Sequence, residues 1–330
     1  MTTTTVPMRA PKVPRKYVPV LVTFCLFIAM FVAGGIRYEG FATGQILLNV
    51  LVDNSFLLVL AIGMTFVILA GGIDLSVGSV VALSTMIAAS MLSGPSPWPA
   101  PVVMLVVLAV GTVLGLGMGA IIHYFEIQPF IVTLAGMFLA RGLCYTISTD
   151  SIPVSDPLFT SIAQTRIDLG PELWVSPSVI IGLVVLVIAM YVLHYTRLGR
   201  GVYAVGGGEQ SALLMGLPVA RTKIAVYTIS GFCSALGGLL FAFYTLSGYG
   251  LHAVGWELDA IAAVVIGGTL LTGGSGYLLG TLLGVLMLGL IQTILSFEGT
   301  LSSWWTRIFI GLLLLVFILL QRLIGWRARS

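Results

Sequence analysis

The sequence has few charged residues. Only 8% of its 330 residues are Asp, Glu, Lys or Arg, whereas 58% are hydrophobic and the mean hydropathy is +1.10. Soluble globular domains carry roughly 25% charged residues. The composition therefore excludes a soluble globular protein and predicts an integral membrane protein, in which apolar runs of about 20 residues mark the membrane spans.

Residues that serve common kinds of catalysis and ligand binding are also scarce. The cysteines, Cys25, Cys144 and Cys233, fall inside apolar runs at spacings that suggest neither a disulfide framework nor a metal site. None of the few lysines follows the glycine spacing of a Walker A loop. The sequence has no Ser/His/Asp constellation and no acidic series typical of a proton relay. We therefore expect no catalytic residues, no metal site, no cofactor bound by this chain and no nucleic-acid partner.

Apolar windows predict an all-α polytopic membrane protein with about ten transmembrane helices. An even number of spans places both termini on the same side of the membrane. The predicted spans are Tyr17–Ile36, Leu47–Ala70, Leu75–Leu92, Ala100–Phe125, Pro129–Ser148, Val175–Tyr195, Lys223–Ser247, Glu257–Leu271, Gly276–Phe297 and Ser303–Leu323.

Basic residues indicate which side that is, because cytoplasmic loops are enriched in Lys and Arg. With both termini cytoplasmic, most of the fifteen basic residues lie on the cytoplasmic side: Arg9, Lys12, Arg15, Lys16, Arg197, Arg200, Arg221, Lys223, Arg322, Arg327 and Arg329. The first apolar run is too long for the core of a cleaved signal peptide, which favours an uncleaved first span. Five tryptophans precede spans that run from outside to inside, where aromatic belts form: Trp98, Trp174, Trp256, Trp304 and Trp305.

These assignments divide the chain into three parts. Residues 1–16 form a basic cytoplasmic tail, residues 17–323 a single transmembrane domain, and residues 324–330 a second basic tail. Within the domain, residues 196–222 form the main inner loop and residues 149–173 the main outer loop. A polar loop as long as the outer one is more often functional than idle.

The two loops differ in charge and in predicted structure. The inner loop is basic at both ends, and Glu209–Met215 is predicted to form a short helix that Gly216 and Pro218 end. This helix is either part of an ordinary surface loop or a docking element for a cytoplasmic motor. The outer loop carries four acidic residues against one arginine, a net charge of −4 + 1 = −3. We expect the outer loop to help receive a partner protein.

The segment "AGGIDLSVGS", residues 70–79, interrupts the apolar pattern. The thirteen residues Val80–Leu92 that follow it span about 20 Å as a helix, less than the roughly 30 Å hydrocarbon core. The segment must therefore lie partly within the membrane, where non-helical backbone is tolerated only inside protein or beside a watery cavity. Asp74 then caps a helix that starts at Leu75, lies on a transport pathway, or pairs with an arginine.

A second interruption, "GGTLLTGGSGYLLG", occupies residues 267–280. Glycine-interrupted hydrophobic segments in both halves of a chain indicate a transport pathway, although glycine also permits close helix packing. For Asn54 and Asp259, helix packing or solvation at a helix end is the alternative to a pathway role. The candidate pathway residues are Gly71, Gly72, Asp74, Ser76, Asn54, Asp259, Gly267 and Gly268.

Three motifs, "AGGIDLSVGS", "YAVGGGEQSALLMG" and "ELDAIAAVVIGGTLLTGG", resemble those of the ribose/xylose/galactose-type ABC importer permeases. The resemblance extends over essentially the whole chain after the first fifteen residues. Two further segments, "SIPVSDP" at 151–157 and "GTLSSWWTRI" at 299–308, narrow it to permeases of galactofuranose importers.

The resemblance implies a multi-pass permease in a bacterial inner membrane that works as a homodimer or a heterodimer. Its implied partners are a cytoplasmic ATP-binding subunit that uses ATP and Mg²⁺, a periplasmic sugar-binding protein, membrane lipid and a sugar, galactofuranose or a related monosaccharide. Another pentose or hexose is the alternative cargo, and a stand-alone channel or ion-coupled carrier is the alternative function. The implied coupling residues are Gly207, Glu209, Ala212, Met215 and Gly216, with Gly208 standing where many relatives have asparagine.

Overall fold

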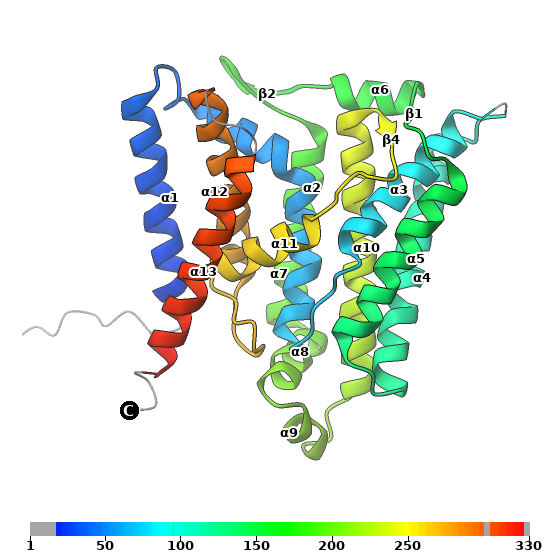
Figure 1. Ribbon diagram of the computed structural model, residues 1–330, viewed down its shortest axis with the longest axis vertical. Helices are drawn as coiled ribbons and strands as arrows, with labels where there is room; N and C mark the ends of the chain where they lie inside the picture. Colours follow the sequence, from blue (N-terminus) through cyan, green and yellow to red (C-terminus); the bar gives the residue numbers. More distant parts are fainter. Residues whose placement is uncertain (1–17, 95, 300–303, 327–330) are drawn as a thin grey trace, which may run out of the picture.

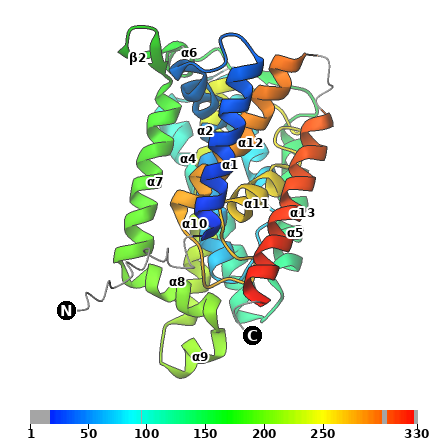
Figure 2. The same ribbon diagram turned by 90° about the vertical axis from the view of Figure 1, so that its left-hand side faces the viewer.

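The computed structural model describes residues 18–94, 96–299 and 304–326, which form a bundle of helices with two small two-stranded sheets (Figures 1 and 2). The helices are α1 (Val18–Arg37), α2 (Gly44–Leu69), α3 (Val77–Leu92), α4 (Ala100–Tyr124), α5 (Pro129–Ile147), α6 (Pro157–Gln164), α7 (Pro177–Tyr195), α8 (Arg197–Gly207), α9 (Glu209–Leu214), α10 (Val219–Thr245), α11 (Trp256–Ile266), α12 (Leu278–Glu298) and α13 (Trp304–Trp326). The strands are β1 (Ile152–Pro153), β2 (Ile167–Gly170), β3 (Leu173–Val175) and β4 (Ser247–Gly248).

The two ends of the bundle carry different elements. Helices α8 and α9 project from one end, and α6 with the β2–β3 hairpin covers the other (Figure 1). We name these the inner end and the outer end, because the inner loop predicted from the sequence contains α8 and α9. The start of α1 and the end of α13 both point toward the inner end (Figure 2). The tails predicted at 1–16 and 327–330 lie outside the described residues, and α13 continues through residues 324–326 of the predicted C-terminal tail.

All ten predicted apolar segments contain a helix, but the helices differ in length. Among the described residues, seven are long and apolar enough to cross a membrane: α1, α2, α4, α5, α7, α10 and α12. Helix α3 has 16 residues and α11 only 11, about 24 Å and 17 Å of helix. The mostly helical, multi-pass architecture is confirmed, whereas ten complete spans and the cytoplasmic termini stay predictions.

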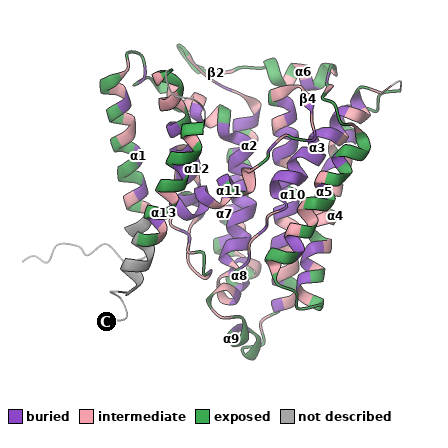
Figure 3. Ribbon diagram, viewed as in Figure 1, coloured by how far each residue is buried: buried purple, intermediate pink, exposed green. Residues whose placement is uncertain are grey.

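Helices α2 and α10 form the centre of the bundle, and α10 packs along α2, α3 and α4. Glycines allow the closest approach: a β-carbon at Gly115 of α4 would lie 3.1 Å from the Cα of Gly231 in α10. Buried residues concentrate on α2, α3, α10 and α11, while α1, α4, α5 and α7 expose apolar side chains on one face (Figure 3). Such faces suit contact with lipid or with another apolar surface.

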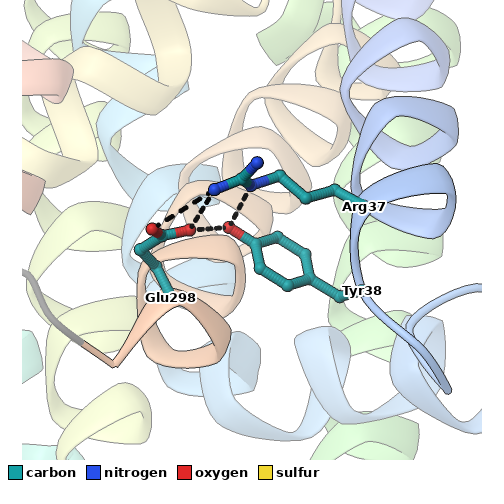
Figure 4. Close-up of polar contacts among 3 residues, drawn as sticks. All are labelled: Arg37, Tyr38 and Glu298. Carbon is teal, nitrogen blue, oxygen red and sulfur yellow. Dashed lines mark hydrogen bonds and ion pairs between the residues drawn. The ribbon is translucent and has the colours of Figure 1, made fainter.

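Polar contacts join the outer ends of α1 and α12. The guanidinium of Arg37 lies 3.4 Å from a carboxylate oxygen of Glu298, and the Tyr38 hydroxyl donates a hydrogen bond to the same oxygen (Figure 4). The Arg37 side chain is largely exposed, and exposed ion pairs contribute little to stability because solvent screens them. This cluster therefore orients the ends of α1 and α12 more than it stabilises the fold.

Several predicted boundaries are wrong by a few residues, and two helices, α6 and α8, are missing from the prediction. Helix α3 begins at Val77 rather than Leu75, and α11 ends at Ile266 rather than Leu271. The inner loop predicted at 196–222 contains α8, and its last four residues belong to α10. Helix α8 was missed because its sequence, RLGRGVYAVGG, has four glycines, which are poor helix formers. Packing of α8 against α7, α10 and α2 compensates for this low propensity.

Candidate functional site

The first interruption is a non-helical segment between α2 and α3, as the sequence predicts. Helix α2 ends at Leu69 and the backbone turns at Gly71, which has φ +83°, a conformation that glycine adopts readily. The amide of Gly72 donates to the carbonyl oxygen of Val67 at 3.0 Å. A β-carbon at Gly72 would overlap the hydroxyl of Tyr227 in α10. Both glycines are therefore needed for the chain to turn tightly beside α10.

Asp74 is fully buried within this segment. One carboxylate oxygen accepts hydrogen bonds from the backbone amide of Ser76 at 2.9 Å and from its hydroxyl at 2.6 Å. The other accepts a 2.7 Å hydrogen bond from the hydroxyl of Ser230 in α10. Ser76, not Asp74, occupies the position just before α3, and the ion pairs among the described residues do not include Asp74. Asp74 thus shapes the turn and ties it to α10.

The second interruption joins the end of α11 to the start of α12. A β-carbon at Gly267 would lie 2.7 Å from the amide nitrogen of Thr281, so the end of α11 contacts the first turn of α12 backbone to backbone. Gly268 has φ +93°. Gly268 and the residues after it leave the helical path, and the loop runs toward the inner end before α12 begins (Figure 1).

The two interruptions meet each other and the end of α8. A β-carbon at Gly273 would lie 2.9 Å from the Cα of Gly71 and 3.1 Å from the Cα of Gly206. The amide of Gly274 donates to the carbonyl oxygen of Leu69, the last residue of α2, at 2.9 Å. The structure therefore brings together three motifs that lie about 65 residues or more apart in the sequence.

Helix α9 has one buried and one exposed face. Ala212 is fully buried and packs with Val205 of α8 and Val219 of α10. Glu209 forms a 2.6 Å ion pair with Lys223 of α10. These contacts fix α9 to the bundle, so Ala212 does not lie on the exposed face that a partner would contact.

The last turn of α9 and the residue after it expose apolar side chains, next to the exposed polar residues Glu209, Gln210 and Ser211 of the first turn. Leu213, Leu214 and Met215 have exposed fractions of 64%, 89% and 68% at the extreme inner end of the molecule. Gly216 has φ +75° and ends the helix. Beside α9, a groove of about 1040 Å³ separates it from the turn that joins α4 to α5, with Glu126 and Gln128 on its far side. An exposed apolar cluster beside a groove lined by both polar and apolar residues is typical of a protein-binding surface.

Two further candidate pathway residues lie away from the interruptions. Asn54 is buried in α2, where its side-chain amide donates to the carbonyl oxygen of Val50 at 2.9 Å and faces Gly289 of α12. Asp259 of α11 forms an ion pair with Arg307 of α13, with N–O distances of 3.0 and 3.2 Å. Asp259 therefore ties α11 to α13, whereas Asn54 bonds within α2 and packs against α12.

Arg141 places a charge within the apolar helix α5, and the structure supplies carbonyl groups as its partners. Its guanidinium donates to the carbonyl oxygens of Gly250 and of His252, the latter at 2.8 Å. Arg307 meanwhile lies beside Gly255 at the other end of the same loop. Arginines from α5 and α13 therefore hold the loop before α11. Within the described part of the chain, no group of three or more His, Cys, Asp or Glu is placed to bind a metal ion.

The outer segment is more ordered than a plain loop. Asp156 accepts hydrogen bonds from the amides of Leu158 and Phe159 and so caps α6. Phe159 is fully buried and packs edge-on against Phe243 of α10, with ring centroids 4.6 Å apart. Strand β1 pairs with β4, and β2 pairs with β3. A shallow hollow of about 480 Å³ on the outward side of α6 is lined by hydroxyl and amide groups, among them Ser161.

The chain is similar to known membrane transport proteins. The family model described as branched-chain amino acid transport system / permease component matches residues 46–318. The inner membrane ABC transporter permease protein YjfF of Escherichia coli (strain K12) is 45% identical over 93% of each chain. The fructose import permease protein FruG of Bifidobacterium longum is 41% identical, covering 96% of this chain and 94% of FruG. The ribose import permease protein RbsC of Haemophilus influenzae is 40% identical, covering 91% and 92%. No solved structure is significantly similar to the chain.

Proposed function

The chain belongs to the family of branched-chain amino acid transport system permease components, and from this premise we propose that it is the membrane-spanning subunit of an ATP-driven sugar importer. Its relatives are ABC permeases, two of them named for the import of fructose and ribose. The chain itself is a translocation component and not an enzyme. ATP hydrolysis, with ATP and Mg²⁺ bound, takes place in a separate ATPase subunit.

The exposed apolar face of α9 is the observation that supports ATPase docking most strongly. Leu213, Leu214 and Met215 lie at the tip of the inner end, in the predicted inner loop and outside the candidate membrane spans, although exposed apolar side chains of this size are costly in water. A partner surface that buries them gains apolar contact. The ATPase occupies this face, and the groove between α9 and the α4–α5 turn receives the part of the ATPase that flanks α9.

The cargo is a neutral monosaccharide, with galactofuranose as the first candidate because segments 151–157 and 299–308 resemble galactofuranose importer permeases. A second permease chain completes the pathway, which runs beside Gly71–Gly72 and Gly267–Gly268. A neutral sugar needs hydrogen-bond donors and acceptors rather than a fixed opposite charge. The outer segment around α6 receives a periplasmic sugar-binding protein, since its capped, packed helix presents a rigid polar surface.

Co-purification and competition test this assignment. A tagged chain expressed with its neighbouring subunits is expected to carry an ATPase, and the assembled importer to take up labelled galactofuranose. Excess unlabelled ribose, xylose or fructose should compete poorly. Strong competition by one of these sugars would identify that sugar, rather than galactofuranose, as the cargo. Failure of any ATPase to co-purify would contradict the proposed function.

A further inference from the structure

The contact between α8 and the two interruptions is stiff, because it is made by backbone atoms. A β-carbon at Gly206 would lie 2.6 Å from the amide nitrogen of Gly274 and would overlap the carbonyl oxygen of Leu69. A β-carbon at Gly274 would lie 2.8 Å from the Cα of Gly207. No flexible side chain separates these segments, and closely packed interiors transmit displacement with little compression.

Two hydrogen bonds reinforce the contact. The Tyr203 hydroxyl in α8 donates to the carbonyl oxygen of Gly276, just before α12, at 2.8 Å. The amide of Gly274 donates to the carbonyl oxygen of Leu69 at 2.9 Å. Burial raises the pKa of Tyr203 to about 12, and neighbouring Tyr277 adds to the shift, so the phenol keeps its proton at neutral pH and remains a donor. Helix α8 is thus tied to the segment before α12, and that segment is tied to the end of α2.

Helix α8 is also fixed to α9. Only Gly208 separates the two helices, and its amide donates to the carbonyl oxygens of Ala204 and Val205 in α8. Buried Ala212 of α9 packs against Val205. A partner that moves the exposed face of α9 therefore moves the end of α8 with it.

One buried hydroxyl in the second interruption, and one in α3 just after the first, lie where a rearrangement could supply a hydrogen-bond partner. The hydroxyl oxygens of Ser79, at the start of α3, and Thr269, in the second interruption, are buried and have no hydrogen-bond partner in the described part of the chain. Buried hydroxyls normally pair, and exceptions often mark strain or function. Non-helical segments with unpaired polar groups are better placed to shift than the continuous helices around them.

We propose that Tyr203, Gly206, Gly273 and Gly274 form a junction that transmits movement of α9 to both interruptions and so couples ATP hydrolysis to sugar translocation. The four residues touch neither the ATPase nor the sugar, and they act as positioning residues. The inference rests on the proposed function, because it assigns the route by which the docked ATPase reaches the pathway. A chain of contacts alone does not establish coupling, so the test measures coupling itself.

The decisive variant is Tyr203→Phe, which removes one hydrogen bond and adds no atoms. The complete importer in proteoliposomes, with its ATPase and sugar-loaded binding protein, is assayed for labelled sugar taken up per ATP hydrolysed. Loss of a neutral hydrogen bond predicts a fall of about two- to tenfold in this ratio. ATPase co-purification and thermal unfolding midpoint should stay as in the wild type. Tyr191→Phe, at an exposed tyrosine of α7, is the matched control and should leave the ratio unchanged.

A second pair of variants tests the backbone contact. Gly206→Ala forces α8 away from Leu69 and Gly274, and sugar uptake should fall further than with Tyr203→Phe while ATP hydrolysis persists. Gly117→Ala in α4, where a β-carbon meets open space, is the control. If Gly206→Ala does not fold, Tyr203→Phe decides.

Three results would overturn the inference. A wild-type ratio of sugar to ATP in Tyr203→Phe would show that the junction does not couple. Loss of ATPase binding in that variant would assign Tyr203 to docking instead. An equal fall in Tyr191→Phe would show a non-specific effect. Failure of the wild-type importer to use ATP for uptake would instead contradict the proposed function, so the two failures are distinguishable.

Discussion

Asp74→Asn is expected to reduce transport while the protein still folds. The carboxylate accepts two hydrogen bonds from Ser76 and one from Ser230. Asparagine keeps the size and one acceptor oxygen, so the bonds from Ser76 can persist, but its amide nitrogen cannot accept a hydrogen bond from the Ser230 hydroxyl. Hydrogen bonds to a charged group contribute about 1.5–3 kcal/mol and neutral ones about 0.5–1.5 kcal/mol. Removing a buried charge offsets part of the loss, and we expect the free energy of unfolding to fall by about 1–3 kcal/mol.

Asp74→Ala provides the comparison for stability. It removes the acceptor for all three donors, and each buried donor left unpaired costs about 1–3 kcal/mol. We therefore expect the alanine variant to lose at least about 3 kcal/mol and to assemble poorly. Ser76→Ala removes one of the three bonds and should lie between the wild type and Asp74→Ala in thermal unfolding of the detergent-solubilised protein.

Transport separates a purely structural role from a pathway role. Because Asp74 ties the first interruption to α10, the asparagine variant should position that interruption less well. Sugar uptake per folded importer should then drop, with expression and ATPase assembly intact. Wild-type uptake per folded importer by Asp74→Asn would refute this reasoning and leave Asp74 as a residue that only shapes the turn.

The remaining predictions concern the surfaces and the ion pair around this centre. Arg307→Gln should lower the free energy of unfolding by about 1–3 kcal/mol, because nearly buried Asp259 loses its partner, while half-exposed Arg307 contributes less than a fully buried charge. Thermal unfolding should show that the double variant with Asp259→Asn recovers part of this loss. No recovery would argue against the pairing. Leu214→Asp should abolish ATPase co-purification. The unfolding midpoint should stay unchanged, since the Leu214 side chain is 89% exposed. If the ATPase still co-purifies, it binds another surface of the protein. Ser161→Arg on α6 should weaken binding of the sugar-binding protein roughly tenfold in a titration, and unchanged affinity would exclude this face.

Much of the fold could be predicted from the sequence, because long apolar runs separated by charged or glycine-rich segments leave few alternatives to membrane helices. The short helix α9 was also predictable, since Gly216 and Pro218 end it. Helix α8 was not, because its four glycines lower helix propensity and only packing against α7, α10 and α2 makes it form. The length of α11 was overestimated because Gly267–Leu271 remains partly apolar after the helix has ended.

The candidate site was predictable as separate motifs but not as an arrangement. The glycine motifs at 71, 206 and 273 meet only through the tertiary fold, and glycine leaves no side-chain pattern that indicates its partner. Arg307 was missed as the partner of Asp259 because 48 residues separate them. Ala212 belonged to a recognisable motif, but only the structure shows that it faces Val205 and Val219 rather than a partner protein.

ATP-driven uptake by purified components shows directly whether the chain is the membrane-spanning subunit of a sugar importer. The chain is reconstituted into proteoliposomes with its second permease subunit, its ATPase and a sugar-loaded binding protein, and labelled sugar is counted inside the vesicles. We expect sugar to accumulate with ATP, but not with a non-hydrolysable ATP analogue and not when the chain is reconstituted alone. Sugar uptake by the lone chain without ATP would contradict this expectation and identify the protein as a channel or an ion-coupled carrier.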